Sequence, residues 1–286
     1  MKFLIMGCNG MAGHMISLYL KEQGHQVIGF ARKKSRFVET IIGDAQDQNL
    51  IRNVTADQNY DVILNCIGVL NQDAEEHKPE AVYINSLFPH LLAEFTRGSK
   101  TKVIQMSTDC VFSGNEGGGY LEHDITDGNT FYGRTKRLGE IEGENSVTIR
   151  CSIVGPDLNA DGMGLLNWFM HQNEPVNGFT EVFWSGQTTL QYAKTIEFVA
   201  KSDITGIYHC VPDGSISKYE LLDLFNKYLR NNKVKIRPVN EPKSDRSLKC
   251  ARSGIDYFVP GYEEMICDLS VWMRKHKELY PHYQME

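Results

Sequence analysis

Hydrophobic and polar positions in the first half of the chain follow two alternating patterns. Stretches with a helical apolar period, at residues 12–24 and 80–98, separate short apolar runs of strand length. Those runs stand at 2–6, 26–30, 61–67, 102–107 and 146–154. Continuous apolar strands that alternate with helices are typical of a parallel sheet covered on both faces. Because such connections are right-handed, we expect a doubly wound α/β sheet.

The alternation stops near residue 154, and the pattern beyond it is mixed. A loop-like stretch leads into shorter helical and strand-like pieces, among them a helix over 217–229. We therefore expect a main domain over residues 1–154 and a smaller, mixed α/β lobe over 155–286. The apolar run at 206–210 is a candidate to return to the main sheet.

Composition narrows the class of protein. The chain has 286 residues, of which 41% are hydrophobic and 23% charged, as in ordinary globular enzymes. The net charge of −6 argues against a nucleic-acid-binding surface. No apolar run is long enough for a signal-peptide core or a membrane span, so we expect no membrane contact. The seven cysteines form no CxxC pair, which indicates reduced thiols in a cytoplasmic protein and no metal site.

A glycine-rich turn joins the first strand to the first helix. Gly7, Gly10 and Gly13 are spaced GxxGxxG within "IMGCNGMAGH". Glycine permits a tight turn and lets the backbone approach a pyrophosphate at a helix N-terminus, where unpaired N–H groups and the helix dipole attract anions. In this strand–loop–helix context the motif predicts a Rossmann domain that binds a dinucleotide, with Asn9 and Met11 as further loop contacts.

The end of the second strand bears on the choice of dinucleotide. An NAD site usually carries an acid about 20 residues beyond the loop, to bind the ribose 2′-hydroxyl. Here "FARKKSR" holds Arg32 among its basic residues and no acid, which favours the 2′-phosphate of NADPH over NADH. A solvated basic turn is the alternative interpretation. Asp44, after an expected third strand, either accepts from the adenine amine or caps the following helix.

The stretch "FYGRTKRLGE" places Tyr132 and Lys136 one helical turn apart, so both side chains lie on one helix face. A nearby ammonium lowers the pKa of a phenol, and such a tyrosine can exchange a proton with a substrate oxygen near neutral pH. The alternative is an incidental pair at an exposed helix start. Thr108, just after the run at 102–107, is expected at the carboxyl end of a strand, where ligands of doubly wound sheets bind.

Four segments together resemble the extended short-chain dehydrogenase/reductase family. They are the glycine loop, "NCIG" (65–68), "STDCVFSG" (107–114) and "YGRTKRLGE" (132–140). More narrowly, the last two segments, with "INSLFPHLLA" (84–93) and "VTIRCSIVG" (147–155), are similar to the dTDP-4-dehydrorhamnose reductase branch and its sugar-nucleotide reductase relatives. The resemblance covers residues 1–155 well. In the second half only 245–253 and 262–269 look similar to the family.

The resemblance implies roles for individual residues. Tyr132 would donate the proton, and Lys136 would hold the nicotinamide ribose and lower the pKa of Tyr132. Thr108 would bond the carbonyl oxygen of the substrate. Asn85 would support the lysine through the backbone and water. The resemblance further implies cofactor contacts from the strand-end residues Cys66, Ile67 and Gly68.

Positions at which this chain differs from other members of the superfamily reduce the number of reactions to be expected. Asp109, Cys110, Val111 and Phe112 are the expected substrate contacts after Thr108. Dehydratases of this superfamily carry Asp–Glu after the threonine, whereas this chain has Asp109–Cys110, so dehydration is not expected. Epimerase-reductases pair a cysteine near this position with a histidine after a Gly-Pro, but Gly155-Pro156 is followed by Asp157. We therefore interpret Cys110 as lining the pocket.

The second lobe is expected to bind the diphosphate of a nucleotide sugar. Arg246 and Lys249 are the candidates, because phosphates attract positive charge, and a solvated charged loop is the alternative. Trp184 either stacks on the base or sugar or belongs to the core.

Three hypotheses of function remain. The first is an NADPH-dependent reductase of a nucleotide-linked 4-keto-6-deoxysugar for surface polysaccharide synthesis. The second is a sugar-nucleotide epimerase of the same fold, and the third is a non-enzymatic, NADP-binding regulatory subunit. Helices at 80–97 and 132–144 resemble those that form homodimers in this superfamily.

Overall fold

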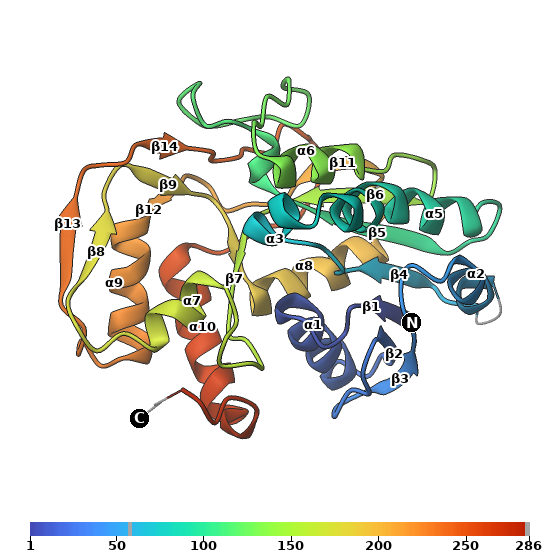
Figure 1. Ribbon diagram of the computed structural model, residues 1–286, viewed down its shortest axis with the longest axis horizontal. Coiled ribbons are helices and arrows are strands. Elements are labelled where there is room, and N and C mark those ends of the chain that lie inside the picture. Colours follow the sequence, from blue (N-terminus) through green and yellow to red (C-terminus); the bar gives the residue numbers. More distant parts are fainter. Residues whose placement is uncertain (57–58, 284–286) are drawn as a thin grey trace.

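The computed structural model describes residues 1–56 and 59–283. Within that part, seven strands form one parallel sheet in the order β11-β6-β5-β4-β1-β2-β3 (Figure 1). They are β1 (Lys2–Met6), β2 (Gln26–Ala31), β3 (Glu39–Ile42), β4 (Val62–Asn65), β5 (Lys102–Ser107), β6 (Ser146–Arg150) and β11 (Gly206–His209). The order 3-2-1-4-5-6 is that of the dinucleotide-binding doubly wound sheet, so the predicted Rossmann architecture is confirmed.

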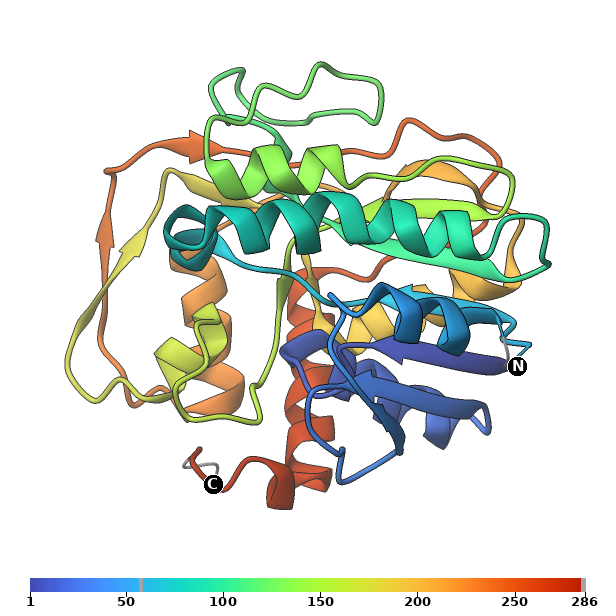
Figure 2. The same ribbon diagram turned by 45° about the vertical axis from the view of Figure 1, so that its right-hand side comes forward.

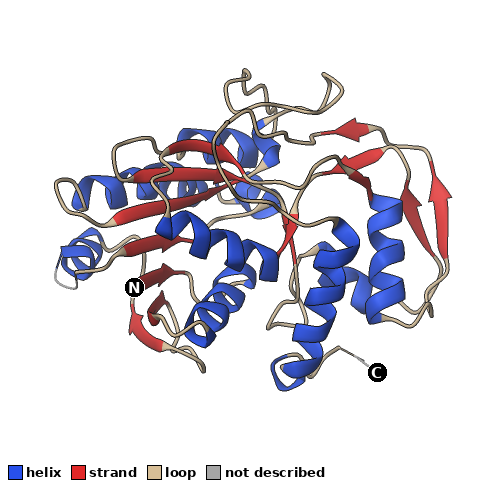
Figure 3. Ribbon diagram, turned by 180° about the vertical axis from the view of Figure 1, so that it is seen from behind, coloured by secondary structure: helices blue, strands red, loops and turns tan. Residues whose placement is uncertain are grey.

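Helices cover both faces of this sheet because its strands alternate apolar side chains between two cores. Phe3 and Ile5 of β1 point into the core beneath α1 (Met11–Glu22) and α8 (Thr189–Lys201). Leu4 and Met6 point into the opposite core, beneath α2 (Gln48–Ala56) and α5 (Phe88–Phe95). Figure 3 shows the sheet from behind, with helices lying across its strands.

A run of helical segments leads from the sheet towards the expected site. It comprises α3 (Asn71–Glu76), α4 (Lys78–Ala81), the π-helical turn η1 (Val82–Leu87) and α5. Helix α6 (Phe131–Leu138) packs beside η1, as the teal and green helices of Figure 2 show. A π-helical turn inside a helix often marks a functional position, and here it contains Asn85.

The second half of the chain builds a smaller lobe and also returns to the main sheet. Strand β11 is the edge strand beside β6, and α8 packs against α1. The lobe holds helices α7 (Leu165–Met170), α9 (Lys218–Leu229) and α10 (Tyr262–Lys275), with the 3-10 turn η3 (Lys277–Leu279) after them. Trp184, Phe225 and Leu269 are among the side chains of its core.

Short strand groups connect the lobe to the sheet. In the described residues they are β12-β9-β14, β13-β8 and β10-β7. Their bounds are β7 (Ile153–Val154), β8 (Val176–Phe179), β9 (Val182–Trp184), β10 (Gln187–Thr188), β12 (Ile216–Ser217), β13 (Ile236–Val239) and β14 (Ser244–Asp245). The apolar run expected as one strand over 146–154 is thus divided, since β6 stays in the main sheet and β7 pairs with β10.

No helix in the described ranges combines the length and apolar character that a membrane crossing requires.

Candidate active site

The glycine loop has the geometry that its sequence predicts. Gly7 has φ +83°, a left-handed conformation that favours glycine. A Cβ on Gly13 would lie 2.1 Å from the carbonyl oxygen of Gly7, so only glycine lets α1 start this close to the strand end. Gly10 caps the helix without a side-chain hydrogen bond. The first N–H groups of α1 therefore have no competing side-chain acceptor at the cap, as anion binding requires.

The basic turn lies beside this loop. Asn9 donates a hydrogen bond from Nδ2 to the carbonyl oxygen of Lys33 at 2.8 Å. Arg32, Lys33, Lys34 and Arg36 are all exposed. The structure therefore brings Arg32 to the same edge of the sheet as the glycine loop, where a 2′-phosphate is expected.

The alternative that Asp44 caps the following helix is wrong. Its carboxylate accepts from the backbone N–H of Gln46 at 2.9 Å, inside the loop after β3. Asp47 performs the capping instead, because its Oδ1 accepts from the N–H of Leu50 at 3.0 Å in the first turn of α2. A contact of Asp44 with adenine stays a prediction.

The loop after β4 packs on the glycine loop. A Cβ on Gly7 would lie 3.0 Å from Cγ1 of Ile67 and 3.3 Å from the carbonyl carbon of Cys66. The N–H of Ile67 donates to the side-chain oxygen of Asn65 at 3.1 Å, which fixes the turn. Cys66, Ile67 and the exposed Gly68 thus stand with the glycine loop at the carboxyl edge of the sheet.

Asn85 connects this loop to α6. Its Oδ1 accepts from the N–H of Val69 at 2.9 Å, and its Nδ2 donates to the Val69 carbonyl at 2.8 Å and to Thr135 Oγ1 at 3.1 Å. Asn85 is fully buried, so these bonds satisfy an amide that would otherwise be costly. Asn85 thus holds Thr135, the residue before Lys136, by a direct hydrogen bond. The predicted support of Lys136 itself through the backbone and water stays a prediction.

Thr108, Tyr132 and Lys136 converge at the end of β5. Thr108 is the N-cap of the 3-10 turn η2 (Asp109–Val111), and its hydroxyl donates to Asp109 Oδ1 at 3.0 Å, near the Tyr132 phenol. Lys136 donates from Nζ to the Met106 carbonyl at 2.6 Å.

Gly133 explains how α6 comes so close. A Cβ at this position would lie 2.1 Å from the carbonyl oxygen of Cys110, so a larger residue would push the helix away from η2. Thr130 caps the helix by accepting from the N–H of Gly133 at 3.0 Å.

The expected lowering of the Tyr132 pKa by Lys136 is wrong for this structure. Burial raises the pKa of Tyr132 well above its ordinary value, and the neighbouring Cys110 and Asp109 add to this, against a hydrogen bond from Thr108. Lys136 does not offset the shift, because its ammonium points to a carbonyl oxygen and not to the phenol. The phenol therefore keeps its proton at neutral pH, as a proton donor must.

A buried ion pair, which the sequence did not reveal, lies beside β5. Arg150 donates to Glu140 through Nε at 2.7 Å and through Nη2 at 2.8 Å. Ser107 donates to the same carboxylate at 2.7 Å, and Arg137 pairs with it at 3.0 Å. Both residues stand in motifs quoted above, "RLGE" and "VTIRC", but their contact joins residues ten positions apart on different elements. The pair fixes the C-terminal end of α6 on β5 and β6.

The predicted substrate residues divide into two groups. Asp109 and Cys110 are partly exposed, and the Cys110 thiol lies 3.7 Å from Asp109 Oδ1. Burial, together with Asp109, raises the pKa of Cys110 to about 11. The side chains of Val111 and Phe112 are wholly buried, and Phe112 stacks on Tyr120 at 4.2 Å between ring centroids. Their side chains therefore do not reach an open surface.

The second lobe brings one of its two predicted cations to Cys110. Arg246 donates from Nη1 to Cys110 Sγ at 3.8 Å and from Nε to the Ser113 carbonyl at 3.2 Å. Lys249 instead lies against Gly119, where a Cβ would be 3.4 Å from its Nζ.

Trp184 is 3% exposed and packs in the lobe core, so it fits the core interpretation and offers no open face for stacking. The ammonium of Lys218 lies over its ring, 5.1 Å from the centroid. Lys218 is also within electrostatic range of Asp109 and Cys110. The sequence did not predict that Lys218 lies near the site. Its only signal in the sequence is a lysine at the start of the helix expected over 217–229.

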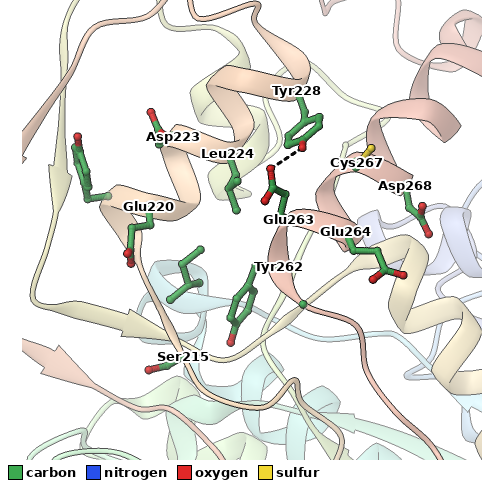
Figure 4. Close-up of a pocket in the computed structure, with 13 residues that line it drawn as sticks. Ser215, Glu220, Asp223, Leu224, Tyr228, Tyr262, Glu263, Glu264, Cys267 and Asp268 are labelled. Atoms are coloured by element: carbon green, nitrogen blue, oxygen red, sulfur yellow. Dashed lines mark hydrogen bonds between the residues drawn. The ribbon is translucent and has the colours of Figure 1, made fainter.

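A separate groove of about 880 Å³ lies between α9 and α10, and none of the predicted site residues lines it. Its lining includes Glu220, Asp223, Glu263 and Asp268, and Tyr228 donates to Glu263 at 2.7 Å (Figure 4). Carboxylates repel phosphates, so this groove does not suit a nucleotide sugar. Within the described residues, no group of three or more His, Cys, Asp and Glu side chains is placed to hold a metal ion.

Comparison with known proteins agrees with this geometry. The model of the RmlD substrate binding domain matches residues 1–255. The chain belongs to the RmlD substrate binding domain family. The match spans the segments whose motifs resembled the dTDP-4-dehydrorhamnose reductase branch.

Individual relatives of this RmlD-family chain are distant. A dTDP-4-dehydrorhamnose reductase of Streptomyces griseus is 31% identical over 140 residues, which are 49% of this chain and 43% of that protein. The chain thus spans less than half the length of this relative. The spore coat polysaccharide biosynthesis protein SpsK of Bacillus subtilis is 25% identical over 77% of this chain and 76% of its own length.

A solved structure shares the fold. It is the crystal structure of a dTDP-4-dehydrorhamnose reductase from Bacillus anthracis in complex with NADP, with a TM-score of 0.82 and 20% identity. The superposition covers 95% of this chain and 99% of that one.

Proposed function

We propose that this chain is an NADPH-dependent reductase of a nucleotide-linked 4-keto-6-deoxysugar. The observation that carries the proposal is the convergence of Thr108, Tyr132 and Lys136 at the carboxyl edge of the sheet, beside a glycine loop, in a chain of the RmlD family. The Streptomyces griseus relative is named for the reduction of dTDP-4-dehydrorhamnose, and SpsK for spore coat polysaccharide synthesis. A role in making a sugar for surface polysaccharides follows from these relatives.

The residues of the site suit NADPH. The N-terminus of α1 has no side-chain cap and suits the pyrophosphate, and Arg32 in the exposed basic turn suits the 2′-phosphate. We place the cofactor against residues 1–154, with Asp44 and Cys66 to Gly68 as further contacts. The substrate would lie between η2 and the second lobe. The NADP complex of the Bacillus anthracis structure supports the same choice of cofactor.

The chain's own residues would supply position and a proton. NADPH, when bound, supplies the hydride that adds to the ketone carbon. Thr108 would hold the carbonyl oxygen by a hydrogen bond, and Tyr132 would pass its phenolic proton to that oxygen as negative charge develops on it. The ketone thereby becomes an alcohol. Lys136, fixed by the Met106 carbonyl, would keep a positive charge beside the cofactor ribose.

The site supports reduction over epimerisation. An epimerase-reductase of this fold, which inverts the carbon next to the ketone by proton exchange, needs an acid/base couple at that carbon. The Cys110 thiol cannot readily accept a proton at neutral pH, because burial raises its pKa to about 11 and it stays protonated. The residue after Gly155-Pro156 is Asp157, whose carboxylate accepts from the N–H of Asn159 at 2.9 Å in its own loop. The presence of Thr108, Tyr132 and Lys136 together at the strand end also favours an enzyme over a regulatory subunit.

The deciding experiment measures NADPH consumption with a panel of dTDP-, UDP- and GDP-linked 4-keto-6-deoxysugars, and identifies each product by NMR. We expect oxidation of NADPH with at least one of them, and a 4-hydroxyl in the product. The Tyr132→Phe variant is the matched control for catalysis by the site. Wild-type protein that binds NADPH but reduces no member of the panel would remove the proposal.

We also infer that the protein is a cytoplasmic homodimer. The run α4–η1–α5 and helix α6 lie side by side and carry large exposed apolar side chains, with Val82 45%, Leu87 43% and Leu138 65% exposed. Such a patch favours contact with a second copy. All seven cysteines are free, which suits a reducing compartment. Light scattering of the purified protein would measure the mass of the assembly.

A further inference from the structure

Two cationic residues, Lys218 and Arg246, lie on either side of the short strand β9 in the second lobe. Strand β9 pairs with β12 on one side and with β14 on the other. Ser217 of β12 and Asp245 of β14 are both paired with Phe183 of β9. Lys218 and Arg246 follow these two residues directly. Because β12 is antiparallel and β14 parallel to β9, Lys218 and Arg246 step away from Phe183 in opposite directions. With neighbouring strands about 4.8 Å apart and a rise of about 3.3 Å per residue, their Cα atoms are about 12 Å apart.

Both cations reach towards the same catalytic turn. The Arg246 guanidinium lies 3.8 Å from Cys110 Sγ. The Lys218 ammonium lies over the Trp184 ring at 5.1 Å and within electrostatic range of Asp109 and Cys110. Two elements that are distant in sequence therefore aim positive charge at the substrate side of η2. The predicted Lys249 does not take part, because it lies against Gly119.

Neither cation has a carboxylate partner. Across residues 1–56 and 59–283, Lys218 and Arg246 form no ion pair, and Lys218 forms no hydrogen bond. Asp127 is in electrostatic range of Arg246, but Ser113 binds its carboxylate at 2.8 Å through the N–H. Burial lowers the pKa of Lys218 to about 8, against the opposing effects of Asp109 and Cys110, which lie in electrostatic range without forming an ion pair with it.

The surroundings of Lys218 show that its position is fixed. It is the first residue of α9, whose N-terminus is held by reciprocal bonds between Ser217 and Glu220. The Trp184 ring beneath the ammonium is buried, and its indole N–H has no acceptor among the described residues. A half-buried ammonium beside a buried, unpaired donor is a place where a bound anion would gain two partners.

We propose that Lys218 and Arg246 hold the diphosphate of the nucleotide sugar between them, on the side of Cys110 away from Tyr132. The inference rests on the proposed function, because it assigns the anion to the substrate of that site. A diphosphate carries two negative charges and several acceptor oxygens. Lys218 and Arg246 supply two positive charges to balance the former and several N–H donors to bind the latter. Asp109 also lies within electrostatic range of Lys218, so in this arrangement its carboxylate borders the diphosphate and faces the hydroxyl groups of the sugar.

The test measures the affinity of the NADP⁺-loaded protein for dTDP and UDP by calorimetry. Lys218→Met should weaken binding roughly 10–100-fold, the range for losing a charge-assisted hydrogen bond. Lys218→Arg, which keeps the charge, should retain most of the affinity. Lys227→Met is the matched control, since Lys227 lies on the same helix but is exposed and pairs with Glu263. NADP⁺ affinity serves as the check that each variant is folded.

Three results would overturn the inference. One is unchanged dTDP and UDP affinity in Lys218→Met, and another is a loss confined to Lys249→Met. The third is Lys218-dependence seen only with UDP-glucuronate, which would move the anion from the diphosphate to a sugar carboxylate. Failure of the proposed function is a separate outcome: Lys218-dependent dTDP binding without reduction of any ketosugar would leave the diphosphate site in place.

Discussion

The Lys136 ammonium donates a hydrogen bond to the main-chain carbonyl oxygen of Met106, at 2.6 Å. Met106 is the penultimate residue of β5, so this bond ties α6 to the strand that presents Thr108. Burial lowers the pKa of Lys136 to about 8, against the opposing effects of Glu140 and Cys66. Of the three proposed catalytic residues, Lys136 is therefore the one that changes charge within the pH range of an ordinary assay.

This pKa predicts how cofactor affinity depends on pH. Lys136 is protonated below about pH 8 and neutral above it, so NADPH affinity should fall as pH rises through that value. Lys136→Met should bind NADPH weakly at every pH, and its profile should lose this step. Fluorescence titration of NADPH over neutral and alkaline pH measures both. A wild-type affinity that stays constant through pH 8 would show that Lys136 does not contact the cofactor as a cation.

Tyr132→Phe keeps the ring and removes only the hydroxyl. General acid catalysis contributes about 10²–10⁴-fold, so turnover should fall by that factor while NADPH binding stays intact. Because the Tyr132 pKa is raised, deprotonation of the phenol should not limit the wild-type rate near neutral pH. Steady-state kinetics and NADPH titration test the two statements. Turnover at the wild-type level in this variant would contradict the assignment of Tyr132 as the proton donor.

Arg32→Ala tests the choice of cofactor. Losing a charge-assisted pair with the 2′-phosphate should cost about 1.5–3 kcal/mol, or roughly 10–150-fold in NADPH affinity, and leave NADH affinity unchanged. Arg97→Ala is a suitable control, since Arg97 is also exposed but pairs with Glu94 on α5. Equal affinities of the wild-type protein for NADPH and NADH would show that the basic turn is merely solvated.

Much of the fold could be predicted from the sequence because its signals are local. The apolar runs of β1, β2 and β5 and the glycine loop each lie within a few consecutive residues. Their order along the chain then restricts the sheet to few topologies. The division of the run at 146–154 between two sheets was not predictable, since it depends on β10, which pairs with Ile153 and Val154.

The site residues could be predicted from the sequence only where they belong to a short local motif. The four-residue spacing correctly put Tyr132 and Lys136 on one helix, but it could not show that Lys136 turns to the Met106 carbonyl. The pKa of Tyr132 was therefore predicted in the wrong direction. Lys218 was missed because its approach to Cys110 depends on the pairing of β12 with β9. Contacts between distant segments leave no periodic signal in the sequence.

Cys110→Ser separates reduction from epimerisation. The thiol is neutral at neutral pH because its pKa is raised to about 11, so a hydroxyl of similar size should replace it with little effect. Ketone reduction should stay within a few-fold of wild type, and substrate affinity should change mildly through the contact with Arg246. If the variant binds NADPH normally yet loses almost all turnover, Cys110 is catalytic and the epimerase alternative becomes the better one.

Gly133→Ala tests whether the close approach of α6 to η2 sets the catalytic geometry. By helix propensity alone, alanine should stabilise α6 by about 1 kcal/mol. Its Cβ, however, would lie 2.1 Å from the Cys110 carbonyl oxygen, so the helix must move and carry Tyr132 with it. A displacement of about 1 Å can cost roughly 10²-fold in rate, and we expect a turnover loss of that order. Gly261→Ala is the control, because Gly261 has φ −64° and no atom near its added Cβ. Thermal unfolding of both variants shows whether the fold is intact. Full activity in Gly133→Ala would mean that Tyr132 need not be held against η2 for proton transfer.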